Sequence, residues 1–242
     1  MEKLVTLENI EKFLASKNFS KNTSLNYTYD LRKFATFMEN RDFNQQNLDI
    51  YKKTLQTSGL SDNAVRRKIS SINQFIKYLY EEKTLDSLFI INQDNKRRQQ
   101  KVELPSLVDT SKFYGQMTSV GHFIALLILE FGLSPSEIRQ LKWSNFDMNF
   151  RLLTIEKNGV KRVLPISNKF ILITKSITNA NDVFSKSRQF LFNELKKFTD
   201  LTAKDLREQY ILQQVKSGQT IGELASNLGL KSMTSLEKYY KK

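Results

Sequence analysis

The chemistry open to this chain is limited first by two residue types that it nearly lacks. Its 242 residues include no cysteine and one histidine, His122. Disulfides, thiolate nucleophiles and cysteine-built metal sites are therefore excluded, and so is any mechanism that needs two histidines. Basic residues dominate instead, because 38 Lys and Arg against 25 Asp and Glu give a net charge of +13. This excess indicates a polyanionic partner, with nucleic acid first and an anionic membrane surface second.

Two short motifs fix local structure around residues that could do chemistry. Residues 134–137 (Ser-Pro-Ser-Glu) have the signature of a helix start, with Ser134 as the N-cap and Glu137 completing a capping box. Residues 157–159 (Lys-Asn-Gly) are a turn signal between the β-branched runs 152–155 and 160–166. The second motif predicts a β-hairpin with Lys157 at its tip.

The stretch 131–147, Phe-Gly-Leu-Ser-Pro-Ser-Glu-Ile-Arg-Gln-Leu-Lys-Trp-Ser-Asn-Phe-Asp, resembles a signature of the tyrosine recombinase (phage integrase) family. The family has Gly-Leu-Arg-x-Ser-Glu-Leu there, followed by Leu-x-Trp-x-Asp-Ile-Asp, and the chain is most similar to its Xer branch. Other family motifs follow in order: a core-binding segment at 20–34, a basic helix at 66–70, a hairpin at 155–165, and partial matches to His-x-Leu-Arg at 204–207 and to Leu-Gly-His at 228–230. The resemblance covers nearly the whole chain.

This resemblance implies phosphoryl transfer from DNA to the protein. In the family, a tyrosine hydroxyl attacks a DNA phosphodiester, giving a 3′-phosphotyrosyl bond and a free 5′-hydroxyl with no metal or other cofactor. The reaction needs a nucleophile, a general acid for the leaving oxygen and fixed positive charge at the non-bridging oxygens. The resemblance implies Tyr239 as the nucleophile, with Tyr240 one residue out of register, Arg207 as a phosphate clamp and Lys157 as the general acid.

Each of these residues also has a simpler explanation that leaves chemistry out. Adjacent tyrosines can pack against their own domain, and Lys157 can be an exposed turn lysine. Arg207 can pair at the surface with Asp205 or Glu208, which lie beside it in the sequence.

Three departures from the family pattern predict impaired catalysis. Ser134 stands where the family has its first arginine, Lys204 where it has the histidine of His-x-Leu-Arg, and Leu230 where it has the histidine of Leu-Gly-His. Lys204 can still donate to a phosphate, whereas Leu230 cannot. Loss of one preorganised cation typically costs about 10²–10³ in rate. Arg139, more than a helical turn beyond Ser134, is not expected to replace it.

The elements that must position these residues are mainly helices, with a small β-hairpin or sheet. Domains are expected at 1–80, a helical core-binding bundle that clamps DNA, and at 106–242, a tyrosine recombinase-like catalytic domain, joined by a linker at 81–105. The bundle has four predicted helices, which begin after Thr6, after Ser20, near 48, and at 61 or 62. The last carries Arg66, Arg67 and part of Lys68 on its outer or flanking side.

The second domain is expected to centre on an apolar helix at 120–131. His122 lies on it and is expected to be a core or helix-start residue rather than a catalytic one. Further helices are predicted at about 168–177, 187–198, 203–216, 220–228 and from about 232.

Together these observations predict an Xer-like, DNA-binding recombinase homologue that is catalytically impaired and acts in the cytoplasm. Its partner is double-stranded DNA, with self-association or a second recombinase on DNA left open, and neither a cofactor nor a membrane is expected. The predicted DNA contacts are Arg66, Arg67, Lys68, Lys161, Arg162 and Lys204. Most would contact phosphates, so neutralising Lys161 and Arg162 together should lower the salt slope of binding by about two.

An alternative function is a non-enzymatic regulator. Residues 220–236 read as a helix-turn-helix, with a capping box, a glycine at the turn and a polar second helix that could enter a major groove. It leaves the hairpin, Arg207 and the N-terminal bundle unexplained.

Overall fold

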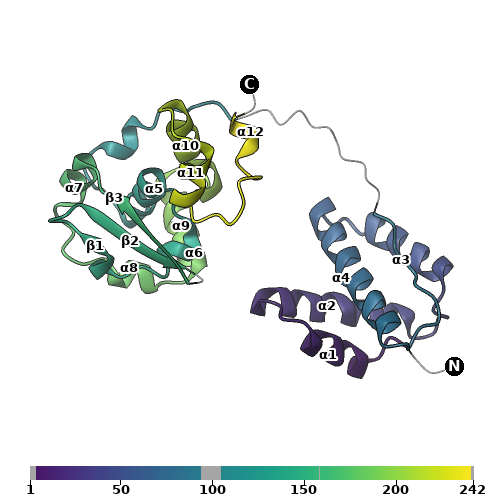
Figure 1. Ribbon diagram of the computed structural model, residues 1–242. Helices are drawn as coiled ribbons and strands as arrows, with labels where there is room; N and C mark the ends of the chain where they lie inside the picture. Colours follow the sequence, from purple (N-terminus) through teal and green to yellow (C-terminus); the bar gives the residue numbers. More distant parts are fainter. Residues whose placement is uncertain (1–3, 94–104, 158, 241–242) are drawn as a thin grey trace. The chain divides into compact units, whose positions relative to one another are not determined.

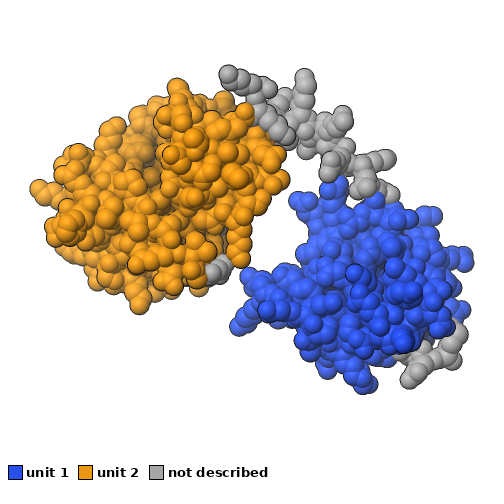
Figure 2. Space-filling view, in the orientation of Figure 1, with its two compact units in different colours: residues 1–98 blue, residues 99–242 orange. Residues whose placement is uncertain are grey.

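The computed structural model describes residues 4–93, 105–157 and 159–240, and the chain forms two compact units, residues 1–98 and 99–242 (Figure 2). Each unit has its own hydrophobic core. The predicted fold class, mainly helical with a small sheet, is confirmed. Within the described ranges, no helix is both long and apolar enough to cross a membrane.

Residues 4–93 of the N-terminal unit form four helices, as predicted (Figure 1). Each begins directly after a residue whose side-chain oxygen accepts a backbone N–H of the first turn, which satisfies a donor that the helix itself leaves unpaired. These caps are Thr6, Ser20, Asn44 and Ser61. The helices are α1 (Leu7–Ser16), α2 (Lys21–Met38), α3 (Gln45–Thr57) and α4 (Asp62–Glu81).

The N-terminal unit extends past its predicted boundary at residue 80. Leu85 and Ile91, which follow α4, are buried in the same core as the four helices. The Asn73 side chain exchanges two hydrogen bonds of 2.9 Å with the backbone of Ile91. The first part of the predicted linker is thus folded onto α4, because its scattered apolar residues have a core to cover although they show no helical period.

The C-terminal unit is built around α5 (Val120–Phe131), which is buried at almost every position, as predicted. Gly121 allows α9 (Arg188–Phe198) to approach closely, since a Cβ there would lie 2.1 Å from the carbonyl oxygen of Glu194. His122 is a core residue, as expected: it is 1% exposed, its Nε2 is 2.8 Å from the carbonyl oxygen of Phe113, and its ring stacks on Phe198.

A three-stranded antiparallel sheet lies in the same unit, in the order β1-β2-β3. β2 (Leu152–Lys157) and β3 (Val160–Pro165) form the predicted hairpin, with Lys157 paired to Val160. The sequence did not predict β1 (Phe146–Asp147), a two-residue strand that pairs with β2.

The remaining described elements of this unit are one long helix, α10, and seven short helices. They are η1 (Ser111–Tyr114), α6 (Pro135–Ile138), η2 (Trp143–Asn145), α7 (Asn168–Thr174), α8 (Asn181–Ser185), α10 (Ala203–Lys216), α11 (Ile221–Asn227) and α12 (Glu237–Tyr240). The predicted helix from about 232 is wrong over its first part, because residues 231–236 form turns and α12 begins at Glu237. The second helix of the alternative helix-turn-helix is therefore absent from the place where it was predicted.

Candidate active site

Three of the predicted site residues line one cavity of about 330 Å³. Lys204 and Arg207 reach it from α10, and Tyr239 reaches it from α12. The rest of its lining consists of Glu208, Ile211, Leu228, Leu230, Ser235, Leu236 and Lys238. The fold thus brings two cations and a phenol from separate segments to one cavity.

Arg207 is held from the turn after α11. Its Nη2 donates a hydrogen bond of 3.3 Å to the carbonyl oxygen of Leu228. Neither ion pair suggested by its sequence neighbours forms, because Asp205 caps α10 through Thr202 and Glu208 pairs with α12. Burial lowers the pKa of the guanidinium from its usual high value, the charge of Glu137 raises that pKa, and Arg162 lowers it. The charges of Glu137 and Arg162 therefore act on the guanidinium of Arg207.

Tyr239 is 8% exposed, and its hydroxyl donates a hydrogen bond of 3.0 Å to Oε1 of Glu208. The same oxygen accepts a bond of 3.2 Å from Lys238, whose ammonium lies 4.5 Å from the centre of the Tyr239 ring. Burial is the largest cause that raises the pKa of Tyr239, and Glu208 raises it further, whereas Lys238 lowers it. Tyr240 points elsewhere and donates to the carbonyl oxygen of Gln219 at 2.7 Å. The two tyrosines therefore have different environments, and Tyr239 is the one at the cavity.

Ser134 is used as a helix cap, as its sequence context predicts. Its backbone N–H and its hydroxyl both donate to Oε2 of Glu137, at 2.8 and 2.6 Å, within a capping box. Arg139 donates to the carbonyl oxygen of Lys186 at 3.1 Å, so it does not fill the place of the missing arginine.

Glu137 is the centre of a buried ionic cluster. It is 2% exposed, and its Oε1 accepts a hydrogen bond of 2.8 Å from Nη2 of Arg162 on β3. Burial acts to raise the pKa of Glu137, but the bonds from Ser134 and the guanidinium of Arg162 outweigh it, so the pKa lies below its usual value. Nη1 of Arg162 lies under the turn at Gly229, where a Cβ would be only 2.6 Å away. This cluster joins α6, β3 and the turn that holds Arg207.

Lys157, at the end of β2, lies beside the same cluster and does not line the cavity. Its Nζ is 3.4 Å from Oγ of Ser136 and 3.9 Å from Oε1 of Glu137, and one third of the side chain is exposed. The predicted general acid is therefore held near the position of Ser134.

Comparison with known proteins then gives the family. The model of the phage integrase family matches residues 97–225, and the model of the phage integrase N-terminal SAM-like domain matches residues 9–83. This chain belongs to the phage integrase family. A "Tyrosine recombinase XerD-like" protein of Lactococcus lactis subsp. cremoris (strain SK11) is 52% identical to it over 234 residues, which is 96% of this chain and 98% of the relative. The predicted resemblance to Xer-type tyrosine recombinases is confirmed.

Two solved structures share the fold of this integrase-family chain. A lambda integrase is 14% identical with a TM-score of 0.73, over 97% of this chain and 94% of that one. The Tn1549 transposon integrase is 12% identical with a TM-score of 0.75, over 98% and 95% of the two chains. The predicted architecture, a helical N-terminal domain and an integrase-type catalytic domain, is thereby confirmed.

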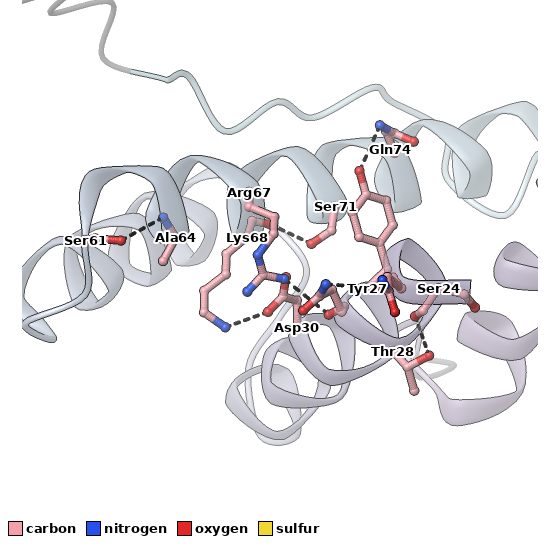
Figure 3. A network of polar contacts seen from close by, with 12 residues as sticks. Ser24, Tyr27, Thr28, Asp30, Ser61, Ala64, Arg67, Lys68, Ser71 and Gln74 are labelled. Atoms are coloured by element: carbon pink, nitrogen blue, oxygen red, sulfur yellow. Dashed lines mark hydrogen bonds and ion pairs between the residues drawn. The ribbon is translucent and has the colours of Figure 1, made fainter. Parts of the chain in front are cut away.

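The basic helix of this tyrosine recombinase differs from its prediction at Lys68 (Figure 3). Lys68 is 5% exposed and its ammonium is 2.6 Å from Oδ1 of Asp30, a carboxylate on α2 that is fully buried. Arg67 pairs with the other oxygen of Asp30 and remains about one third exposed. The prediction that part of Lys68 lies on the outer side is wrong, because the ion pair with Asp30 keeps the ammonium inside the bundle. Arg66 is exposed.

The two predicted DNA-binding residues of the hairpin also differ in exposure. Lys161 is exposed, whereas Arg162 is 8% exposed and paired with Glu137. Successive side chains of a strand point to opposite faces, so one faces solvent and the other faces the domain. Arg162 is therefore placed as an internal residue, and its predicted phosphate contact is not accessible in this structure.

Sequence reasoning missed the acidic partners of three predicted functional residues, one in the N-terminal unit and two in the C-terminal unit. Asp30, Glu137 and Glu208 each hold a predicted functional residue, namely Lys68, Arg162 and Tyr239. Glu137 was predicted only as a capping residue, and Glu208 only as a surface partner of Arg207. A carboxylate in a chain with net charge +13 is a weak signal, but all three lie within the matched motifs or directly after one of them. Over the described residues, no group of three His, Asp or Glu side chains could hold a metal ion.

Proposed function

We propose that this chain is an Xer-like tyrosine recombinase homologue that binds double-stranded DNA and whose strand cleavage is impaired. The observation that carries the proposal is the single cavity lined by Lys204, Arg207 and Tyr239. The structural relatives are a lambda integrase dimer bound to a core site, a Tn1549 integrase with transposon end DNA and an XerH recombinase bound to its difH substrate. The charge of +13 suits the same partner, and a DNA partner supports the proposed cytoplasmic location.

In this proposal the cavity receives a scissile phosphate. Arg207 and Lys204 neutralise the non-bridging oxygens, and the hydroxyl oxygen of Tyr239 attacks phosphorus. One P–O bond forms to the tyrosine as the bond to the 5′-oxygen breaks, and the tyrosine proton passes to solvent water. Lys157 gives a proton to the leaving 5′-oxygen, which requires its ammonium to leave its place beside Glu137. The reverse reaction joins the 5′-hydroxyl of another strand.

The proposed impairment rests on two side chains, Ser134 beside Glu137 and Leu230 in the lining of the cavity. Ser134 has its hydroxyl committed to Glu137 and offers no cation. Leu230 lines the cavity with an aliphatic side chain and cannot donate a hydrogen bond to phosphate. Each lost donor typically lowers the rate by about 10²–10³, so cleavage should be slow rather than abolished.

A nicked suicide substrate tests this proposal, because it traps the phosphotyrosyl adduct once the short strand diffuses away. The expected result is slow adduct formation that is lost in Tyr239→Phe and in Arg207→Ala and retained in Tyr240→Phe. Adduct that forms as fast as in a recombinase with both arginines would refute the impairment. Adduct that is lost in Tyr240→Phe and kept in Tyr239→Phe would refute the assignment of the nucleophile.

DNA binding is measured separately, so that failure of cleavage is not mistaken for failure of binding. Affinity for duplex DNA should fall steeply with salt, because contacts to phosphates release counterions. A plot of log K against log salt that is nearly flat would overturn the DNA-binding part of the proposal.

A further inference from the structure

The cavity that is proposed to receive DNA contains one carboxylate. Glu208 follows Arg207 directly on α10, and its side chain is 16% exposed. Three cations, Lys204, Arg207 and Lys238, line the same cavity. Glu208 forms no ion pair with the neighbouring Arg207. Its Oε1 instead accepts hydrogen bonds from the hydroxyl of Tyr239 and the ammonium of Lys238. The carboxylate thus fastens α12 to α10 through two contacts.

We propose that Glu208 is a positioning residue that restrains Tyr239. Its carboxylate binds the hydroxyl of the candidate nucleophile against α10 until a DNA phosphate enters the cavity and breaks this hydrogen bond. This inference rests on the proposed function, in which Tyr239 attacks a phosphate in this cavity. The 3.0 Å bond engages the only proton of the phenol. A phosphodiester at Arg207 would bring a second negative charge close to Glu208, so the contact and the bound phosphate oppose each other.

Glu208 does not serve well as the proton acceptor for the attack. Carboxylates are far weaker bases than phenolates, so transfer of the tyrosine proton to a carboxylate is strongly uphill. Its negative charge and its hydrogen bond both favour the neutral phenol, whose pKa is raised by burial first and by Glu208 in addition. Lys238 lowers the pKa of Tyr239 and so favours the phenolate. The contact between Glu208 and Tyr239 therefore restrains the nucleophile and does not activate it.

The restraint can be tested without DNA. 3-Fluorotyrosine is incorporated at position 239 of the full chain, and its pKa is followed by ¹⁹F NMR. Glu208→Ala should lower that pKa, because the variant removes both the hydrogen bond that holds the phenol proton and the repulsion between the carboxylate and the phenolate. Glu208→Gln keeps an acceptor oxygen without the charge and should give a smaller fall. Lys238→Met should raise the pKa, which a general loosening of α12 would not do.

The neighbouring tyrosine is the matched control. A label at position 240 should titrate unchanged in Glu208→Ala, because its hydroxyl binds the Gln219 carbonyl and its pKa is raised by burial and Glu223. Equal pKa values at position 239 in the parent protein and in both folded Glu208 variants would overturn the restraint.

The suicide substrate then separates this inference from the proposed function. If Glu208 restrains the nucleophile, Glu208→Ala should form adduct measurably faster than the parent chain, because the hydrogen bond that holds the hydroxyl of Tyr239 is removed. A slower reaction would mean that Glu208 assists the attack, and would overturn the restraint. Lack of adduct in every variant would count against the proposed cleavage alone, and the titration would still decide the restraint.

Discussion

The buried carboxylate of Glu137 accepts a hydrogen bond of 2.8 Å from the guanidinium of Arg162, and this ion pair joins α6 to β3. Both side chains are at least nine-tenths buried. The pair lies between Ser134, whose hydroxyl donates to Glu137, and the turn at Gly229, which lies against Arg162. Lys157 lies 3.9 Å from the same carboxylate, and Arg162 lies at the turn beside the Leu228 carbonyl that binds Arg207, so loss of the pair should disturb both residues.

Removal of Arg162 should destabilise the C-terminal unit strongly. Arg162→Met leaves Glu137 buried without its partner, which typically costs about 3–5 kcal/mol. The one tryptophan, Trp143, lies in this unit, so its fluorescence during urea unfolding measures the loss. Lys161→Met, at the exposed neighbouring position, should change the free energy of unfolding by less than about 0.5 kcal/mol. Equal effects of the two variants would contradict the internal placement of Arg162.

Acid should remove the contribution of Glu137. Its pKa in the folded chain lies below the usual value of 4.5, so the ionised form stabilises the fold fully above pH 4.5 and less as the pH falls further. The difference in unfolding free energy between the parent chain and Glu137→Gln should therefore be constant above pH 4.5 and shrink below it. A difference that grows on acidification would show that folding raises the pKa of Glu137 instead of lowering it.

Gly229→Ala should disturb the same cluster from the turn above it. The residue has a φ of +62°, and a Cβ would lie 2.6 Å from Nη1 of Arg162. Gly218→Ala is the matched control, with a φ of +86° and no atom within 4 Å of the added Cβ. The control should lose about 1–2 kcal/mol from backbone strain alone. Gly229→Ala should lose more, and adding Arg162→Ala should recover part of the excess because it removes the clash.

The salt dependence of DNA binding should separate surface cations from buried ones. The sequence predicts that Lys161 and Arg162 together account for about two units of slope, but the burial of Arg162 reduces this to about one. Lys161→Ala should therefore lower the slope of log K against log salt by about 0.9, and Lys68→Met, in the interior of the N-terminal unit, should leave it unchanged. A loss of slope in Lys68→Met with the bundle still folded would mean that its ammonium reaches DNA.

Restoring the missing arginine should raise cleavage. Ser134→Arg returns a guanidinium to the family's first arginine position, at the cost of about 1 kcal/mol for the lost helix cap. Adduct on the suicide substrate should form up to about 10²-fold faster. Ser136→Arg adds the same charge two residues away, at an exposed position, and should not accelerate the reaction. An equal gain in both variants would point to better DNA binding rather than to a repaired clamp.

The sequence by itself determined the family, the four-helix bundle, the hairpin, and the two positions, Ser134 and Leu230, on which the proposed impairment rests. These features depend on local signals: side-chain caps, apolar periods, a turn motif and the order of short motifs along the chain. Each is written within a few residues, so one sequence suffices to predict it.

Only the tertiary structure decided which charged residues face inward and what they bind. Lys68 pairs with Asp30, Arg162 with Glu137 and Tyr239 with Glu208, and each pair joins two elements that are distant in the sequence. The local sequence around a basic residue on a strand or helix does not show whether its side chain faces solvent or a buried carboxylate. Its direction is fixed by the packing of the neighbouring element, because a buried charge is stable only where that element supplies a partner.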